Sequence, residues 1–245
     1  MRRIFFKKIA FLNIKENELN NLFKKKGLFV FPSGPGLSTI NREKTYLKSL
    51  INADYVFFDS GYFVILLRII KNIKVNKISG YLFLLNFFKF LKKNKHLKIL
   101  SFDPNLSLSK SNFRFLKKIG LKNKNLINYI APIYKKGKIK DYDLIKLIKK
   151  NNPNYIILNI GGNVQEILGS YINKKLNKNV RIFCTGAAIS FFSGDQAPIN
   201  KFLDRIFLGW LIRILYKPIV FFPRYLLAIK LIFIVLNEKI KISKS

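Results

Sequence analysis

Cysteine and histidine each occur once in this chain, and their scarcity excludes several kinds of catalytic or metal site. Cys184 has no partner for an internal disulfide, and its place in an apolar segment favours a small core residue over a nucleophile. His96 lies in a lysine-rich stretch that is typical of a protein surface. Because there is no second histidine, neither a histidine-based zinc site nor a Ser-His-Asp triad is expected.

Several nucleotide-binding and membrane-spanning patterns are also missing. The chain has no GxxxxGK(S/T) sequence, and the GGN at residues 161–163 does not fit GxGxxG, so neither a P-loop nor a dinucleotide site is predicted. No run reaches the roughly 18 uncharged apolar residues of a spanning helix. The nearest run, residues 219–236, contains Pro223, Arg224 and Lys230, which is typical of a segment that lies on a membrane. The N-terminus lacks the apolar region of a signal peptide.

Acidic residues are few, with 12 against 46 lysines and arginines, and the formal net charge is +34. Such an excess favours an anionic partner: nucleic acid, an anionic lipid surface or a phosphorylated substrate. Lysine, asparagine and isoleucine are all abundant, as AT-rich coding also produces, so part of the charge has a purely compositional explanation. Apolar residues make up 49% of the chain, which is enough for a sizeable core.

Short apolar runs alternate with longer helical patterns over the first 196 residues. Strands are predicted at 28–31, 55–58, 98–102, 155–160 and 181–184, and helices near 43–52, 61–72, 80–94, 109–119, 141–150 and 163–177. This alternation predicts an α/β fold with a mostly parallel sheet flanked by helices. After residue 196 no strand is predicted. We expect a core at 1–196 and a helical appendage at 197–245, with breaks near Pro218 and Pro223 and a frayed tail.

Glycine and short polar residues follow each predicted strand. In a parallel sheet, ligands bind beyond the carboxyl ends of the strands, where the backbone must approach them closely. Any βα turn uses such residues, but five turns at one edge favour a binding site. The predicted substrate-binding residues, at these turns, at the helix start near residue 80 and in the polar stretch near 195, are Ser33, Ser60, Gly61, Gly80, Gly161, Gly162, Gln165, Glu166, Gly186, Asp195 and Gln196.

Four acidic residues and one amide are candidates for chemistry or for structural capping. Asp59 ends an apolar strand, so it is either a general base with a raised pKa or the N-cap of the next helix. Asp103 has the same two interpretations, with capping favoured. Asp195 is suited to hydrogen-bonding a sugar or holding an arginine. Gln165 and Glu166 begin a helix, at the positive end of its dipole, where Gln165 either binds a sugar hydroxyl or phosphate or simply caps the helix.

Arginines recur in the C-terminal segment, at Arg205, Arg213 and Arg224. The guanidinium fork suits phosphate oxygens, so these three are the predicted diphosphate-binding residues. No metal is expected. If a diphosphate binds, we predict that backbone amides and arginine or lysine carry the neutralising charge.

Four segments, in this order, resemble the bacterial WecG/TagA/CpsF glycosyltransferase family. ADYVFFDSG at 53–61 is similar to a strand end written aDxxxxDG, and KISG at 77–80 is similar to RxxG. IGGNVQE at 160–166 is similar to GxPxQE. The longest match, 185–228, is similar to a motif that contains an RAP sequence, an EW pair and further arginines.

The resemblance implies a Rossmann-like fold and an inverting transferase of cell-surface polysaccharide synthesis. The donor would be a UDP-linked N-acetylmannosamine-type sugar or another hexosamine, and the acceptor a polyprenyl-diphosphate-linked sugar. Asp59 takes the position of the proposed base and Gln165 that of the family's glutamine, with no metal or other cofactor. Arg205, Arg213 and Arg224 fall in an appendage that touches the membrane. The implied location is cytoplasmic, on the inner face of the bacterial cytoplasmic membrane, against its anionic surface.

Several positions depart from the family's motifs. PSGPG at 32–36 replaces an asparagine-bearing motif, Lys77 and Gln196 replace arginines, and Gly209 replaces the glutamate of the EW pair. These departures affect the identity of the donor sugar more than the reaction class.

Two other functions remain as alternatives. A basic nucleic-acid-binding module is compatible with the charge and with an aromatic content of 15%, although no nucleic-acid motif is present and no nucleic-acid partner is expected. An inactive scaffold of a polysaccharide assembly complex is the other, and the presence of Asp59 and Gln165 argues against it.

Overall fold

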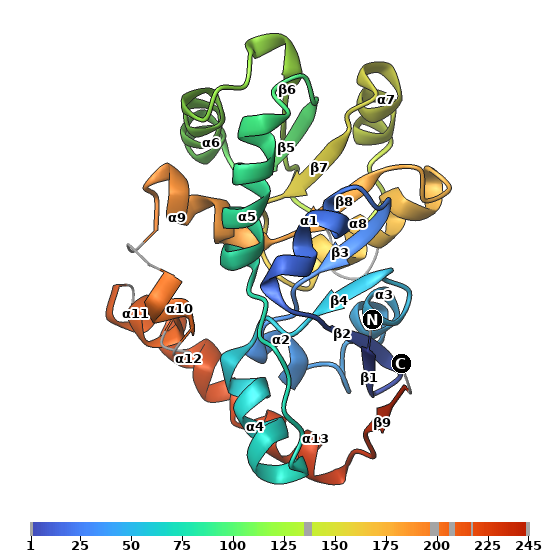
Figure 1. Cartoon of the computed structure of the whole chain (residues 1–245), viewed down its shortest axis with the longest axis vertical. Helices are drawn as coiled ribbons and strands as arrows, with labels where there is room; N and C mark the ends of the chain where they lie inside the picture. Colours follow the sequence, from blue (N-terminus) through green and yellow to red (C-terminus); the bar gives the residue numbers. More distant parts are fainter. Residues whose placement is uncertain (1, 135–138, 197–200, 206–208, 217, 244–245) are drawn as a thin grey trace.

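The computed structural model describes residues 2–134, 139–196, 201–205, 209–216 and 218–243, and in these ranges nine strands form one sheet with helices on both faces (Figure 1). The strands are β1 (Arg2–Phe6), β2 (Ile9–Asn13), β3 (Gly27–Val30), β4 (Tyr55–Phe57), β5 (Ile99–Asp103), β6 (Leu126–Ile130), β7 (Tyr155–Leu158), β8 (Arg181–Cys184) and β9 (Lys241–Ile242). Their order is β6-β5-β7-β8-β3-β4-β2-β1-β9, and each neighbouring pair from β6 to β2 is parallel. The predicted α/β fold with a mostly parallel sheet is confirmed.

All five predicted strands are present, as β3, β4, β5, β7 and β8, but the N-terminal hairpin and β6 were not predicted. Strands β1 and β2 are joined at Lys7 and Lys8, which both have positive φ (50° and 65°). Such turns usually use Asn-Gly or Asp-Gly, so two lysines give no hairpin signal. Strand β6 is an edge strand with no fully buried residue, and it therefore lacks the apolar run that marks the central strands.

The C-terminal tail is a strand, and the prediction of a frayed tail with no strand after residue 196 is wrong. Strand β9 pairs antiparallel with β1, placing Ile4 opposite Ile242. Ser243 extends the pairing, because its backbone N–H donates to the Arg3 carbonyl and its Oγ accepts from the Arg3 N–H, each at 2.9 Å. A two-residue strand is too short to show an alternating apolar pattern, so it could not be predicted from the sequence.

The six helices predicted before residue 178 are confirmed as α3 to α8. The α-helices are α1 (Leu19–Phe23), α2 (Gly34–Ser38), α3 (Lys44–Ile51), α4 (Gly61–Lys71), α5 (Gly80–Lys93), α6 (Leu106–Lys118), α7 (Tyr142–Asn151), α8 (Val164–Lys175), α9 (Ser190–Ser193), α10 (Lys201–Arg205), α11 (Gly209–Tyr216), α12 (Pro218–Ala228) and α13 (Lys230–Asn237). Helix α12 continues through Pro223, where a break was predicted. The carbonyl that lacks its donor four residues earlier belongs to Ile219, a residue 90% exposed, so this carbonyl lies in an exposed part of the helix.

Alternate residues of each central strand face two separate cores. In β3 and just after it, Leu28 and Val30 join the core beneath α3, α4, α7, α8 and α13, whereas Phe29 and Phe31 join the core beneath α1, α5 and α6. The largest fully buried side chains are Tyr46 and eleven phenylalanines. Many of the aromatic side chains are therefore core residues, and these are not available to stack on nucleic-acid bases. This weakens the nucleic-acid-binding alternative.

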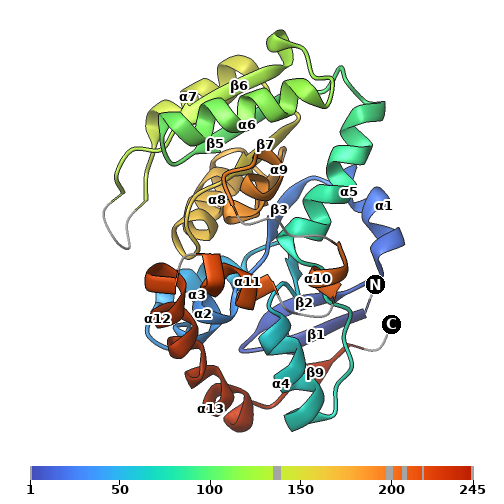
Figure 2. The same ribbon diagram turned by 90° about the vertical axis from the view of Figure 1, so that its left-hand side faces the viewer.

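The C-terminal helices pack against the α/β core. Helix α12 contacts α2, and α13 contacts both α2 and α4 (Figure 2). Leu231 and Val235 are fully buried in the core that α4 also covers, whereas Ile219, Phe233 and other apolar residues of α12 and α13 are exposed. Within the described ranges, no helix combines the length and apolar character needed to cross a bilayer. The division into a core and an appendage stays a prediction.

Three helices have their N-termini at the carboxyl edge of the sheet, and each of them has a serine as its N-cap. Ser33, Ser60 and Ser79 are the N-caps of α2, α4 and α5, and their Oγ atoms accept from the N–H groups three residues on, at 3.0–3.3 Å. N-capping satisfies backbone donors that would otherwise be orphaned. The positive ends of these helix dipoles therefore gather at this edge.

Candidate active site

A cavity of about 430 Å³ lies beyond the carboxyl ends of β3, β4, β7 and β8. Twelve of the residues predicted to bind or react with substrate line it: Ser33, Asp59, Ser60, Gly61, Gly80, Gly161, Gly162, Gln165, Glu166, Gly186, Asp195 and Gln196. Arg224, from α12, lines it as well. Arg205 and Arg213 belong to α10 and α11, but their side chains lie outside the described part of the chain. The strand-end residues thus share one cavity.

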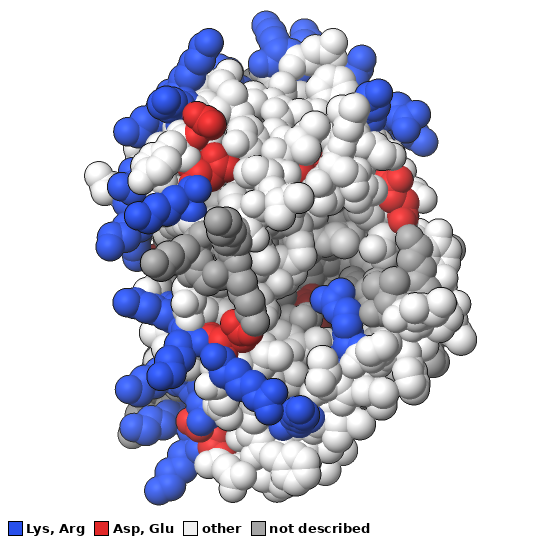
Figure 3. All heavy atoms as spheres, turned by 180° about the vertical axis from the view of Figure 1, so that it is seen from behind, with Lys and Arg blue, Asp and Glu red and all other residues white. Residues whose placement is uncertain are grey.

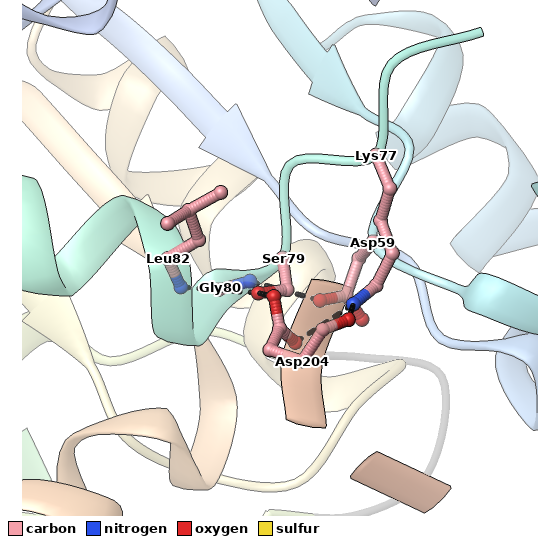
Figure 4. A network of polar contacts seen from close by, with 6 residues as sticks. All are labelled: Asp59, Lys77, Ser79, Gly80, Leu82 and Asp204. Carbon is pink, nitrogen blue, oxygen red and sulfur yellow. Dashed lines mark hydrogen bonds and ion pairs between the residues drawn. The ribbon is translucent and has the colours of Figure 1, made fainter. Parts of the chain in front are cut away.

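Asp59 lines the cavity and contacts the start of α5 rather than capping α4, the helix that follows it. Ser60 is the N-cap of α4, and so the capping interpretation of Asp59 is wrong. Asp59 Oδ1 instead accepts at 2.8 Å from the backbone N–H of Gly80, the first residue of α5 (Figure 4). A carboxylate at the N-terminus of a helix is stabilised by the helix dipole, so this contact fixes the orientation of Asp59 at the edge of the cavity.

A buried ion pair joins the C-terminal segment to the start of α5. Lys77 Nζ lies 2.7 Å from Asp204 Oδ1, and their side chains are only 10% and 8% exposed. Ser79 Oγ donates to Asp204 Oδ2 at 2.8 Å, and Lys77 Nζ donates to the Asp204 carbonyl at 2.6 Å (Figure 4). All three residues line the cavity. Lys77 and Ser79 lie in the KISG motif, from which only Gly80 was predicted, and Asp204 had no local signal.

Gln165 and Glu166, in the first turn of α8, form a relay of hydrogen bonds. The Gly186 N–H donates to Gln165 Oε1 at 2.7 Å, and Gln165 Nε2 donates to Glu166 Oε1 at 3.0 Å. Gln165 thus bridges to the turn after β8, and the simple capping interpretation is wrong. Gly186 has φ of +58°, a conformation that glycine adopts without strain.

Glu166 is a buried carboxyl with an unusual titration. Its side chain is 1% exposed, and Oε2 has no hydrogen-bond partner among the described residues. Burial, and to a smaller extent the nearby negative charge of Asp59, raise the pKa of Glu166 to about 7, against the lowering effect of its hydrogen bonds. Burial, Glu166 and Asp59 also raise the pKa of Tyr46, whose hydroxyl stays protonated. Glu166 therefore gains or loses its proton near neutral pH.

Asp103 lies inside β5 and caps no helix, so the capping interpretation favoured for it is wrong. Asn105 is the N-cap of α6 and accepts from the Leu108 N–H at 3.0 Å. Asp103 Oδ1 accepts from Ser101 Oγ, Asn112 Nδ2 and Asn159 Nδ2 at 2.7–3.0 Å. Burial raises the pKa of Asp103, although these donors oppose the shift. Of this group, only Asn159 lines the cavity.

Asp195 connects two helices at the rim of the cavity. Its Oδ2 accepts from Ser193 Oγ at 2.8 Å, and its Oδ1 accepts from Ser111 Oγ of α6 at 3.3 Å. The neighbouring Gln196 has a buried Oε1 with no hydrogen-bond partner among the described residues. The observed partners of Asp195 are therefore hydroxyls, not an arginine.

One DxD sequence, Asp141-Tyr142-Asp143, lies away from the cavity. Asp141 of this Asp-Tyr-Asp sequence caps α7 through the Leu144 N–H at 2.8 Å. It also accepts from the hydroxyls of Tyr129 and Tyr134, and neither Asp141 nor Asp143 lines the cavity. In the described ranges no three His, Cys, Asp or Glu side chains cluster as metal ligands.

Basic side chains lie mostly at the margins of the face seen in Figure 3, whose middle is largely neither basic nor acidic. The cavity itself is lined by the cations Lys77 and Arg224 together with the carboxylates Asp59, Glu166 and Asp204, among others. Its charge is therefore mixed, and any anion that enters meets a small number of fixed cations.

Comparison with known proteins gives one clear result. A family model described as "Glycosyl transferase WecG/TagA/CpsF family" matches residues 6–245, which is nearly the whole chain. No curated protein matches the chain significantly. The matched range includes every residue placed in the cavity above.

Proposed function

The chain belongs to the WecG/TagA/CpsF family of glycosyltransferases, and from this premise we propose that it transfers a hexosamine from a UDP donor to a polyprenyl-diphosphate-linked sugar. Family membership itself supports glycosyl transfer in cell-surface polysaccharide synthesis. The observation that carries the proposal is the gathering of twelve predicted catalytic and substrate-binding residues around one cavity of about 430 Å³. That volume lies within the range of small-molecule sites, roughly 300–1,000 Å³.

Asp59 is the general base of the proposed reaction. It takes a proton from the acceptor hydroxyl, which attacks the anomeric carbon on the face opposite to UDP, so the configuration inverts. The carboxylate is supported in this role by its fixed position, since the Gly80 N–H holds one oxygen at 2.8 Å. General-base assistance is typically worth about 10²–10⁴ in rate.

The departing UDP carries charge that the cavity must stabilise. Arg224 lines the cavity, and Arg205 and Arg213 complete the proposed diphosphate-binding set without a metal. Gln165 and Glu166 are proposed to hold the donor sugar, because the relay from Gly186 orients both and leaves Glu166 Oε2 available. The glycine backbone at 161–162 leaves open space beside them.

The lipid-linked acceptor places the reaction at a membrane surface. Exposed apolar residues on α12 and α13, including Ile219 and Phe233, are proposed to dock on the anionic inner face of the cytoplasmic membrane. Each nearby lysine contributes about 1 kcal/mol to such binding.

The test is an assay of the full chain with a panel of UDP-sugars and a polyprenyl-diphosphate-sugar, read by mass spectrometry. We expect free UDP and a lipid product heavier by one sugar for one or two donors. Asp143→Asn, an exposed carboxylate outside the cavity, is the matched control for Asp59→Asn. No product with any donor, from protein that is folded and binds liposomes, contradicts the proposal.

A further inference from the structure

Asp204 occupies a position whose surroundings resemble an anion-binding site. Its carboxylate receives a lysine ammonium at 2.7 Å and a serine hydroxyl at 2.8 Å, from Lys77 and Ser79. Ser79 is the N-cap of the 14-residue helix α5, so both donors lie at the positive end of that helix. A cation, a hydroxyl and a helix N-terminus together are the groups that proteins use for phosphate oxygens.

We infer that Lys77 and Ser79 form a binding site for a diphosphate, and that Asp204 occupies this site as an internal substitute until the diphosphate displaces it. The inference deepens the proposed function, on which the identity of the diphosphate rests. The carboxylate of Asp204 stands in for two phosphate oxygens. Lys77, Ser79 and Asp204 all line the same cavity as Asp59, so the exchange takes place where the substrate enters.

The burial of the ion pair argues against a role confined to stability. Lys77 and Asp204 side chains are 10% and 8% exposed, and the desolvation of two such charges offsets much of their mutual attraction. A diphosphate carries more charge and more acceptor oxygens than one carboxylate, so it interacts more strongly with the same lysine. Exchange therefore favours the diphosphate once it reaches the cavity.

A second ion pair supplies the matched control. Lys201, at the start of α10, contacts Glu16 Oε1, so α10 is held at both ends, by Glu16 and by Lys77. Glu16 does not line the cavity. Glu16→Gln and Asp204→Asn each remove one negative charge and weaken one attachment of α10, but only Asp204→Asn removes the negative charge that occupies the inferred site.

The experiment is calorimetric titration of the full chain with inorganic pyrophosphate, at fixed ionic strength. Because the internal carboxylate lowers the competent fraction, Asp204→Asn is expected to bind pyrophosphate about tenfold more tightly than the wild type. Lys77→Met is expected to bind it about tenfold more weakly, since a charge-assisted contact is lost. Glu16→Gln is expected to match the wild type.

Two results overturn the inference. One is an unchanged or weaker affinity in Asp204→Asn when its circular dichroism shows native folding. The other is an equal gain in Glu16→Gln, which would show that loosening α10 is sufficient. Thermal unfolding of each variant separates loss of folding from loss of the site, and Ser79→Thr, which keeps the hydroxyl, is the conservative replacement expected to retain binding.

Two further ligands identify the source of the diphosphate and separate this inference from the proposed function. A gain in Asp204→Asn for UDP but not for geranyl diphosphate assigns the site to the donor, and the reverse assigns it to the lipid acceptor. If UDP binds but neither UDP nor geranyl diphosphate binds more tightly to Asp204→Asn than to the wild type, the inference fails while the proposed function stands. If pyrophosphate shows the expected gain but neither UDP nor uridine binds any variant, the inference stands and the proposed function fails.

Discussion

The ends of β4 and β5 look alike in sequence and differ in structure. Each strand finishes in an apolar run followed by an aspartate, Asp59 or Asp103. Asp59 lines the cavity and holds the N-terminus of α5, whereas Asp103 lies within the sheet among amide and hydroxyl donors. The difference shows that an aspartate at a strand end is a candidate base only if neighbouring elements bring it to an open cavity.

The largest expected difference between the two aspartates is in catalytic turnover. Asp59→Asn is expected to lower turnover by about 10²–10⁴, because an amide cannot accept the proton of the acceptor hydroxyl. Asp103→Asn is expected to change turnover by no more than a few-fold. The measurement is UDP release under saturating donor and acceptor. Near-wild-type turnover in Asp59→Asn would remove Asp59 from the role of base.

For the free energy of unfolding, substitution of Asp103 is expected to have a larger effect than substitution of Asp59, the opposite of the order expected for turnover. Asp103→Ala leaves the buried donors of Ser101, Asn112 and Asn159 without their acceptor, and a cost of about 4 kcal/mol follows. Asp59→Ala removes the acceptor of one backbone N–H and is expected to cost about 1 kcal/mol. Urea unfolding of the two variants gives both values. Equal costs would mean that the Asp103 donors find other partners.

Glu166 extends the comparison to another carboxyl of the cavity, which is buried and titrates near neutral pH. Its pKa is about 7 in the folded protein against an ordinary value of 4.5, so the folded state binds the proton more tightly and stability falls as the pH rises between these values. Glu166→Gln cannot ionise, and above pH 7 it is expected to be more stable than the wild type by about 3 kcal/mol. Thermal unfolding at pH 4 and pH 8 tests this, since the gain should nearly vanish at pH 4, below both pKa values. A gain of the same size at both values contradicts a raised pKa.

The smallest effects concern the caps that follow the two aspartates. Ser60→Ala and Asn105→Ala each remove one N-cap hydrogen bond and are expected to cost about 1 kcal/mol. Only Ser60 lines the cavity, so only Ser60→Ala is expected to weaken donor binding as well. Chemical unfolding and donor KM give the two readouts. An increase in donor KM in Asn105→Ala would contradict the claim that only the cap after β4 contributes to donor binding.

The parts of the fold that could be predicted from the sequence are those that local patterns of apolar and polar residues determine. Central strands such as β3 and β7 have compact apolar runs, and the turns after them carry glycine and short polar residues, so the sheet and the cavity's composition were both predictable. The sequence also predicted that Asp59 and Gln165 lie near one another, because both follow parallel strands.

What was missed depends on contacts between distant residues. The pairing of Asp204 with Lys77 joins residues 127 positions apart, and the pairing of β9 with β1 joins the two ends of the chain. Neither leaves a local pattern. Capping, one of the two interpretations of Asp59 and the favoured one of Asp103, was wrong for a similar reason, since Ser60 and Asn105 take the capping positions.

A crystal structure of the protein with UDP bound tests the central claim most directly: the carboxyl edge of β3, β4, β7 and β8 holds a sugar nucleotide. The expected result is UDP in the cavity, with its diphosphate within hydrogen-bond distance of the basic side chains that line it and its distal phosphate on the side of Asp59. An empty cavity at saturating UDP, or a nucleotide bound on another surface, would contradict it.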